Sequence, residues 1–251
     1  MTIYRHKHML LVALTSLAVL AGALIRGYTG FGASMVWVAS LSLVYPPATV
    51  VPTVLMLEVL ASITLLPTVF GAVQWRSMRW LLASTVLTMP VGVALLTTIP
   101  EREMRIVVAA AILAATVAVA RGVELSGPPG LRSTLVAGSI SGVVNGSTGM
   151  GGPPAVLLYF SGANPVDAGR ATLIAYFLGT DAIGVSIMAA SGLVDRVVLI
   201  HTALFAPLAL IGIAAGQRVY KLRGERGFRR VVLGLLLVLA AAMLLRALAF
   251  G

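Results

Sequence analysis

Two glycine-rich breaks interrupt long apolar stretches of this chain, and they occupy the same place in two related halves. The breaks are Thr29-Gly30-Phe31-Gly32-Ala33-Ser34 and Thr148-Gly149-Met150-Gly151-Gly152-Pro153-Pro154. Overlaying Thr29 on Thr148 sets an ungapped offset of 119 residues. At that offset identical residues coincide, namely Thr15 with Thr134, Ala18 with Ala137, Gly27 with Gly146, Ser42 with Ser161, Pro46 with Pro165 and Thr53 with Thr172. The pattern predicts an internal repeat with one break in each copy.

The composition places this repeat in a lipid bilayer. Of the 251 residues, 59% are hydrophobic and only 10% are charged, and the mean hydropathy is +1.01. A soluble domain is about 25% charged. Runs of about 17–25 apolar residues, long enough to cross a bilayer, recur along the chain. We therefore expect an all-α polytopic membrane protein with lipid as its permanent surroundings.

Several other classes of function are disfavoured. The net charge of +10 does not indicate nucleic-acid binding, because the arginines lie between apolar runs as topology-setting loop charges do. The chain has no cysteine and only three scattered histidines, so neither a metal site nor a redox relay is expected. No glycine loop is followed by Lys-Ser or Lys-Thr, as an ATP site would require. We expect no cofactor.

The apolar segments divide the chain into a first repeat (1–120), a linker (121–132) and a second repeat (133–251). The predicted segments lie at about 9–25, 31–45, 48–70, 80–99 and 105–120, and then at about 133–145, 153–161, 168–190, 197–217 and 230–250. The first two segments of each repeat are short, and the break joins them. At 1.5 Å per residue the short ones cannot cross a core of about 30 Å. Each pair is therefore predicted to form a short or re-entrant hairpin, with its tip near the membrane midplane and facing protein or a watery cavity.

The N-terminus also resembles a cleavable signal peptide, with Arg5 and Lys7 before an apolar run that ends in Ala21-Gly22-Ala23. The repeat match begins inside that run, at Thr15, so cleavage would truncate one repeat and leave its twin intact. We expect the segment to be retained.

Loop charges give the topology. An odd number of segments per repeat should invert the second repeat, and the basic loops at 74–79 and 218–230 are not equivalent in the repeat. By the positive-inside rule both are cytoplasmic. The linker then lies inside and both termini lie outside, although Arg5 and Lys7 argue against that placement.

Inverted repeats with interrupted helices are typical of secondary transporters. A helix N-terminus carries unpaired N–H groups and about half a positive charge, and glycine allows an anion to approach that backbone closely. Helices are expected to begin just after Gly32 and Gly152, and symmetry would aim both at one central volume. The alternative is that the glycines only permit close helix packing. Two breaks in register, each between unusually short segments, favour a binding site.

The predicted anion site therefore comprises both breaks and three nearby donors. The break residues are Thr29, Gly30, Phe31, Gly32, Ala33, Ser34, Thr148, Gly149, Met150, Gly151 and Gly152. Arg26 lies just before the first break, and Asn145 is its repeat counterpart. Both side chains can donate hydrogen bonds to an anion. Arg170 is the third donor or, alternatively, a cytoplasmic anchor with no ligand.

Charges inside apolar segments cost at least about 2.5 kcal/mol at the helix centre, so they usually face a partner or a cavity. Glu58 and Asp181 are either proton carriers or, as we favour, charge partners of Arg26 and Arg170. His201 could titrate near neutral pH, but packing between helices is the simpler expectation. Arg246 should reach the membrane interface. The aromatic residues near the breaks are expected to pack, with gating as the alternative: Tyr28, Phe31, Tyr159, Phe160 and Tyr176.

With these residues assembled, the chain resembles the TauE/SafE family of membrane anion exporters, also called the sulfite exporter family. In that family each of two halves carries a glycine-rich loop, an apolar helix and a Pro-containing turn. In this chain the second copy reads Gly149-Met150-Gly151-Gly152-Pro153 and then Ala163-Asn164-Pro165. The first copy reads Gly30-Phe31-Gly32-Ala33-Ser34 and then Tyr45-Pro46-Pro47. The first copy departs from the pattern, having Ala33-Ser34 where glycines are usual. The resemblance implies export of sulfite or an organosulfonate across the cytoplasmic (inner) membrane.

Three alternatives stay open at this point. The same loops could form the filter of an anion channel, or the substrate could be another small anion or a carboxylate. An intramembrane enzyme is disfavoured, because no catalytic constellation recurs at workable spacing and Glu58 and Asp181 are the only candidate acid pair. A monomer and a homodimer are both compatible with the sequence.

Overall fold

The computed structural model describes residues 2–42, 44–120, 130–160 and 165–223, and within these ranges the chain is helical, with no strand. The elements in chain order are α1 (Thr2–Thr29), α2 (Ala33–Leu41), α3 (Pro47–Leu65), η1 (Leu66–Thr68), η2 (Phe70–Ala72), α4 (Trp75–Thr98), α5 (Glu101–Ala120), α6 (Leu131–Thr148), α7 (Gly152–Phe160), α8 (Val166–Ala190) and α9 (Arg196–Arg223). The linker at 121–129, the run at 230–250 with Arg246, and Ala163-Asn164 lie outside the described residues.

Four helices are long and apolar enough to cross a membrane, so the chain is a multi-pass membrane protein. They cover Pro47–Thr68, Trp75–Thr98, Val166–Ala190 and Arg196–Leu222. These are the predicted segments at 48–70, 80–99, 168–190 and 197–217. Their outward faces carry exposed apolar side chains suited to lipid, such as Leu87 on α4 and Ile211 on α9.

The leading helix of each half is longer than its apolar run predicted. α1 has 28 residues and α6 has 18, whereas the runs at 9–25 and 133–145 are shorter. A run of apolar residues indicates the part of a helix that contacts lipid, and both of these helices extend beyond their apolar runs. At its C-terminal end α6 runs on through Asn145, Gly146 and Ser147, which are buried against protein. By contrast α2 and α7 have nine residues each, about 14 Å of helix.

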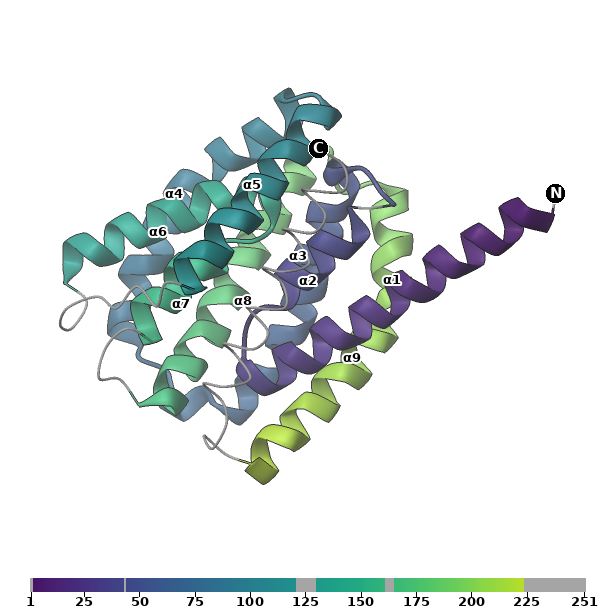
Figure 1. Ribbon diagram of the computed structural model, residues 1–251. Coiled ribbons are helices and arrows are strands. Elements are labelled where there is room, and N and C mark those ends of the chain that lie inside the picture. The colour runs from purple at the N-terminus through teal and green to yellow at the C-terminus, as the bar shows by residue number, and fades with distance from the viewer. Residues whose placement is uncertain (1, 43, 121–129, 161–164, 224–251) are drawn as a thin grey trace.

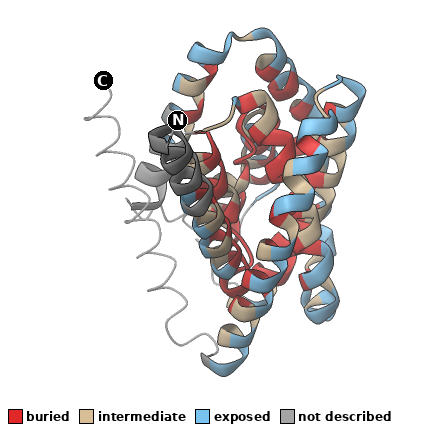
Figure 2. Cartoon of the chain, turned by 90° about the vertical axis from the view of Figure 1, so that its right-hand side faces the viewer, coloured by how far each residue is buried: buried red, intermediate tan, exposed pale blue. Residues whose placement is uncertain are grey.

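The two halves of the chain exchange partners in the bundle. α4 packs along α6, and α1 packs along α9, so each leading helix pairs with the fourth helix of the other half. α3 and α8 contact each other in the centre, and they also contact α9 and α4 respectively. In Figure 1 the α4–α6 pair and the α1–α9 pair lie on opposite sides of α3 and α8. The buried residues gather on the inner faces of these helices (Figure 2).

Glycines permit the close approach in both exchanged pairs. On α6, Cβ atoms added at Gly138, Gly142 and Gly146 would lie 2.6, 2.2 and 2.5 Å from carbonyl oxygens of α4. On α9, a Cβ at Gly216 would lie 2.0 Å from the carbonyl oxygen of Leu24 on α1. These distances are far inside van der Waals contact, so the small-residue packing of membrane helices applies here. The glycines that serve packing are therefore mostly other than those of the breaks.

Candidate functional site

The two breaks share a backbone design. α1 is closed by a hydrogen bond from the N–H of Gly30 to the carbonyl of Arg26, and α6 by one from Gly149 to Asn145, both 2.8 Å long. Gly30, Gly32 and Gly149 have φ values of 83°, 88° and 71°. These left-handed conformations strongly favour glycine and turn the chain sharply from one helix into the next. Thr29 supports the first turn, because its hydroxyl accepts the N–H of Phe31 at 3.2 Å.

Arg26 is buried beside the first break, where its two terminal nitrogens donate hydrogen bonds and its Nε forms an ion pair. Its Nε lies 2.9 Å from Oε2 of Glu58, its Nη2 donates to the Ser62 hydroxyl at 2.8 Å, and its Nη1 donates to the carbonyl of Gly30. The guanidinium also lies over the ring of Phe177, 4.8 Å from the centroid. Only 1% of Arg26 and 4% of Glu58 is exposed. The expected pairing of these two charges is present.

Glu58 bridges that arginine to the start of α2. Its Oε1 accepts the backbone N–H of Ser34 at 2.9 Å, and Ser34 is the second residue of α2. A carboxylate thus lies at a helix N-terminus, where unpaired N–H groups and the helix dipole favour negative charge.

The second break has the amide of Asn145 where the first has the guanidinium of Arg26. The Asn145 amide donates to Oδ1 of Asp181 at 2.9 Å, and its Oδ1 accepts the N–H of Gly151 at 3.1 Å. The Ser141 hydroxyl donates to the carbonyl of Gly151 at 2.7 Å. A Cβ at Gly151 would lie 2.6 Å from both Asn145 Cβ and Ser141 O. Close approach to α6 therefore requires glycine at this position.

Contacts at the two breaks correspond at the offset of the repeat. Arg26 overlays Asn145 and Ser62 overlays Asp181, and each pair is joined by one side-chain hydrogen bond, at 2.8 and 2.9 Å. Within the part of the chain that the structure describes, Asp181 is therefore hydrogen-bonded to the amide of Asn145 and forms no ion pair with an arginine. Ser62, Ser141 and Phe177 were not predicted as site residues. The repeat offset alone could have found Ser62, as the counterpart of Asp181.

Arg170 ties α8 to the end of α1. It donates to the carbonyls of Gly27 at 2.9 Å and Tyr28 at 3.2 Å, and its guanidinium lies 4.2 Å from the ring centroid of Tyr220. It is 2% exposed. A cation is well placed at these last carbonyls of a helix. The side chain is thus deep within protein, next to the first break.

The remaining predicted residues pack nearby or elsewhere. Ala33, Met150 and Thr148 are buried, and the Thr148 hydroxyl donates to the carbonyl of Val144. Phe31 stacks on Phe160, with centroids 5.7 Å apart. The remaining aromatic residues near the breaks, Tyr28, Tyr159 and Tyr176, are buried as packing predicted. His201 lies on α9 against Tyr45 and Phe205, with ring centroids 4.3 and 6.3 Å apart.

The site therefore combines four buried charged side chains with two sharp backbone turns. Arg26, Glu58, Arg170 and Asp181 all lie within the bundle, where uncompensated charge would be costly. Among the described residues no group of three or more potential metal ligands is present. At the first break the backbone N–H of Ser34 and the guanidinium of Arg26 lie on either side of one carboxylate.

Comparison with known proteins identifies the family to which this chain belongs. The family model described as sulfite exporter TauE/SafE matches residues 14–243. A protein of Cupriavidus necator named a probable sulfite/organosulfonate exporter TauE is 27% identical over 234 residues, which cover 90% of this chain and 91% of that relative. No solved structure matches the chain significantly. Members of the matching family are membrane transporters and not enzymes. Because the family model covers nearly the whole chain, this protein belongs to the TauE/SafE sulfite exporter family.

Proposed function

We propose that this protein is a secondary transporter that exports a small sulfur-containing anion, sulfite or an organosulfonate, across the cytoplasmic membrane. The observation that carries the proposal is the carboxylate of Glu58, which is bound between the N-terminus of α2 and buried Arg26. This place accepts an anionic oxygen. The name of the relative from Cupriavidus necator supplies the substrate class.

In this proposal the two halves are inverted repeats that face each other across a pseudo-two-fold axis. The exchanged pairs α1–α9 and α4–α6 support it, because exchanging corresponding helices of the two halves, α1 with α6 and α9 with α4, turns one pair into the other. The two hairpins α1–α2 and α6–α7 then point their breaks at the centre, near the membrane midplane. Rocking of one repeat against the other would open that centre to each side in turn.

The anion takes the place of Glu58. A sulfonate or sulfite oxygen can accept the hydrogen bond from Ser34 and form an ion pair with Arg26, as the carboxylate does. Glu58 must then leave its cation, and a carboxyl group that loses its partner inside a bundle is stable only when protonated. Anion binding at the first break is thus linked to proton uptake by Glu58. Asp181, paired with Asn145, contributes to the local charge balance.

The two breaks contribute unequally to binding. At the first break, the N–H groups of the first turn of α2 include that of Ser34, already bound to an anionic group. At the second break, Pro153 and Pro154 have no N–H, and the N–H of Gly151 is held by Asn145. We infer that the first break holds the anionic head, while the second shapes the cavity wall. Arg170 fixes the end of α1 and adds positive potential.

Transport by purified protein in proteoliposomes tests this function. We expect saturable efflux of sulfite and of a short organosulfonate, accelerated by the same anion on the opposite side, as a transporter but not a channel requires. Chloride and sulfate should compete weakly. The driving force is an outward gradient of the anion, because one proton taken up with each monovalent anion leaves no net charge on which a membrane potential could act. Non-saturable flux shared equally with chloride would indicate a channel, and absence of sulfite and sulfonate flux would reject the substrate class.

A further inference from the structure

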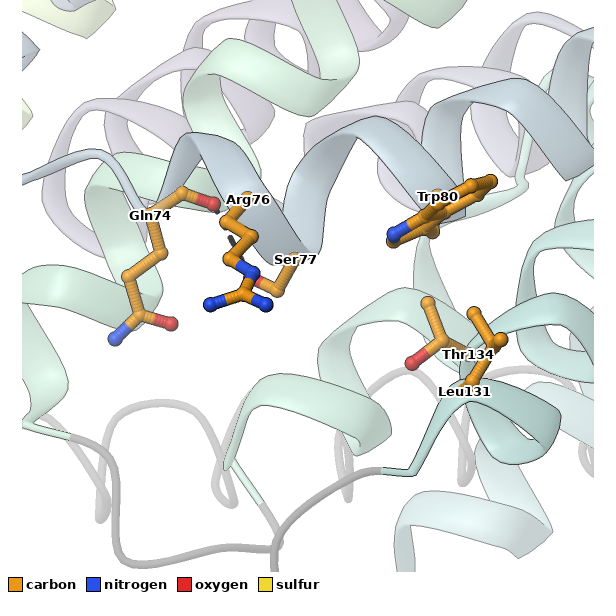
Figure 3. A pocket seen from close by; sticks show the side chains of 6 residues that line it. All are labelled: Gln74, Arg76, Ser77, Trp80, Leu131 and Thr134. Atoms are coloured by element: carbon orange, nitrogen blue, oxygen red, sulfur yellow. Dashed lines mark hydrogen bonds between the residues drawn. The ribbon is translucent and has the colours of Figure 1, made fainter.

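A pocket of about 590 Å³ lies where the N-terminal ends of α4 and α6 meet, away from the two breaks. Its lining residues are Gln74, Arg76, Ser77 and Trp80 from the start of α4, and Leu131 and Thr134 from α6. Figure 3 shows the Arg76 guanidinium and the Gln74 amide on the same side of α4, with Trp80 and Thr134 towards the other end of the pocket. The volume suits a small organic anion.

The lining of this pocket has the chemistry of an anion receptor. It contains a guanidinium, an amide, hydroxyl groups and an indole N–H, all hydrogen-bond donors, and no carboxylate. Arg76 is exposed and makes no hydrogen bond or ion pair with any residue that the structure describes. Its neighbour Arg79 does not line the pocket, and lies instead over the ring of Trp80 at 5.5 Å. A free guanidinium fork is well suited to the oxygens of a sulfonate or sulfite.

The floor of the pocket connects to the helices that carry the central site. The Ser77 hydroxyl lies 3.0 Å from the hydroxyl of Tyr159, which is buried on α7, the short helix that begins at Gly152. The N–H of Gln74 donates to the Thr172 hydroxyl at 2.9 Å. Thr172 follows Arg170 by two residues on α8. Both contacts lead from the pocket to α7 and α8, beside the breaks.

We propose that this pocket is the cytoplasmic capture site for the exported anion, where Arg76 binds the anionic head before it passes inward. Trp80 offers an apolar face for the organic part of a sulfonate. The inference rests on the proposed export function and on the cytoplasmic placement of the basic loop at 74–79. In this scheme the Ser77–Tyr159 contact closes the inner end of the pocket, and it must open for the anion to reach the first break.

The test measures the apparent KM for a short organosulfonate at each face separately, in everted and right-side-out membrane vesicles. For Arg76→Gln we expect KM at the cytoplasmic face to rise about tenfold or more, because a charge-assisted contact is lost. The maximal rate of efflux and KM at the outer face should stay unchanged, while the maximal rate of influx should fall by the factor by which the cytoplasmic KM rises, as reversibility requires. Arg79→Gln removes the same charge from the same end of α4 and should change KM at the cytoplasmic face less than twofold.

The possible outcomes separate this inference from the function on which it rests. An unchanged cytoplasmic KM in Arg76→Gln, with normal sulfonate flux in the wild type, would overturn the capture site and leave the exporter proposal intact. An equal rise at both faces, or an equal effect of Arg79→Gln, would also overturn it and indicate a general loss of surface potential. A wild-type protein with no sulfonate flux would overturn both.

Discussion

Replacing Arg26 by methionine is expected to lower the free energy of unfolding by about 3–5 kcal/mol, since it leaves the buried Glu58 without its cation. The same change removes the donors to Ser62 and to the carbonyl of Gly30. Adding Glu58→Gln should restore most of the loss, because a neutral amide can still accept the N–H of Ser34. Neither the single nor the double variant should transport, because the guanidinium that would bind the anion is absent.

Denaturant or thermal unfolding in detergent measures this effect, with flux in proteoliposomes as the second readout. Glu101→Gln is the control, because it breaks an ion pair that is largely exposed, between Glu101 and Arg105. Its expected cost is below about 1 kcal/mol. Wild-type stability of Arg26→Met, or a double variant no more stable than the single one, would contradict the account of a charge pair that stabilises the first break.

Gly151→Leu is expected to reduce transport at least about 100-fold while the protein still inserts in the membrane. The new side chain would begin 2.6 Å from Asn145 Cβ and Ser141 O. The second break must therefore shift, and the contacts of Asn145 with Gly151 and Asp181 are lost. A displacement of about 1 Å at a binding site can cost a factor of about 100.

Gly71→Leu provides the matched control for this prediction. Gly71 lies in the exposed turn before α4, and nothing lies within 4 Å of a Cβ added there. Its transport and expression should equal those of the wild type. Both variants are measured for the amount of protein in the membrane and for sulfite efflux. Normal efflux by Gly151→Leu would place the second break outside the transport path.

Much of the fold could be predicted from the sequence, because a membrane-spanning helix requires a long run of apolar residues, which is visible in the local composition. The runs at 48–70 and 168–190 became α3 and α8, and the family was recognised from the glycine-rich motifs. Helix ends were harder to predict. α6 continues to Thr148 because its last turns face α4 and not lipid. The length of an apolar run does not indicate how far a helix continues where it packs against protein.

The contacts of the site were only partly predictable, because they join residues far apart in the chain. The pairing of Arg26 with Glu58 was favoured from the cost of buried charge, and it is present. The partner of Arg170 was expected to be a carboxylate, whereas the structure gives it two carbonyls at the end of α1. The contact between Glu58 and Ser34 could not be predicted, because it requires knowing how α3 packs against the start of α2.

The most direct test of the central claim is the proton stoichiometry of anion binding, measured by calorimetry in buffers of different ionisation enthalpy. An organosulfonate is the suitable ligand, because its head stays ionised at neutral pH and takes up no proton itself. If the anion displaces Glu58 from Arg26 and Ser34, the wild type should take up about one proton per sulfonate bound, since the displaced carboxyl group is stable only in its neutral form. Glu58→Gln should bind the sulfonate with no proton uptake. Binding to the wild type without proton uptake, or uptake that persists in Glu58→Gln, would contradict the proposal that the substrate takes the place of this carboxylate.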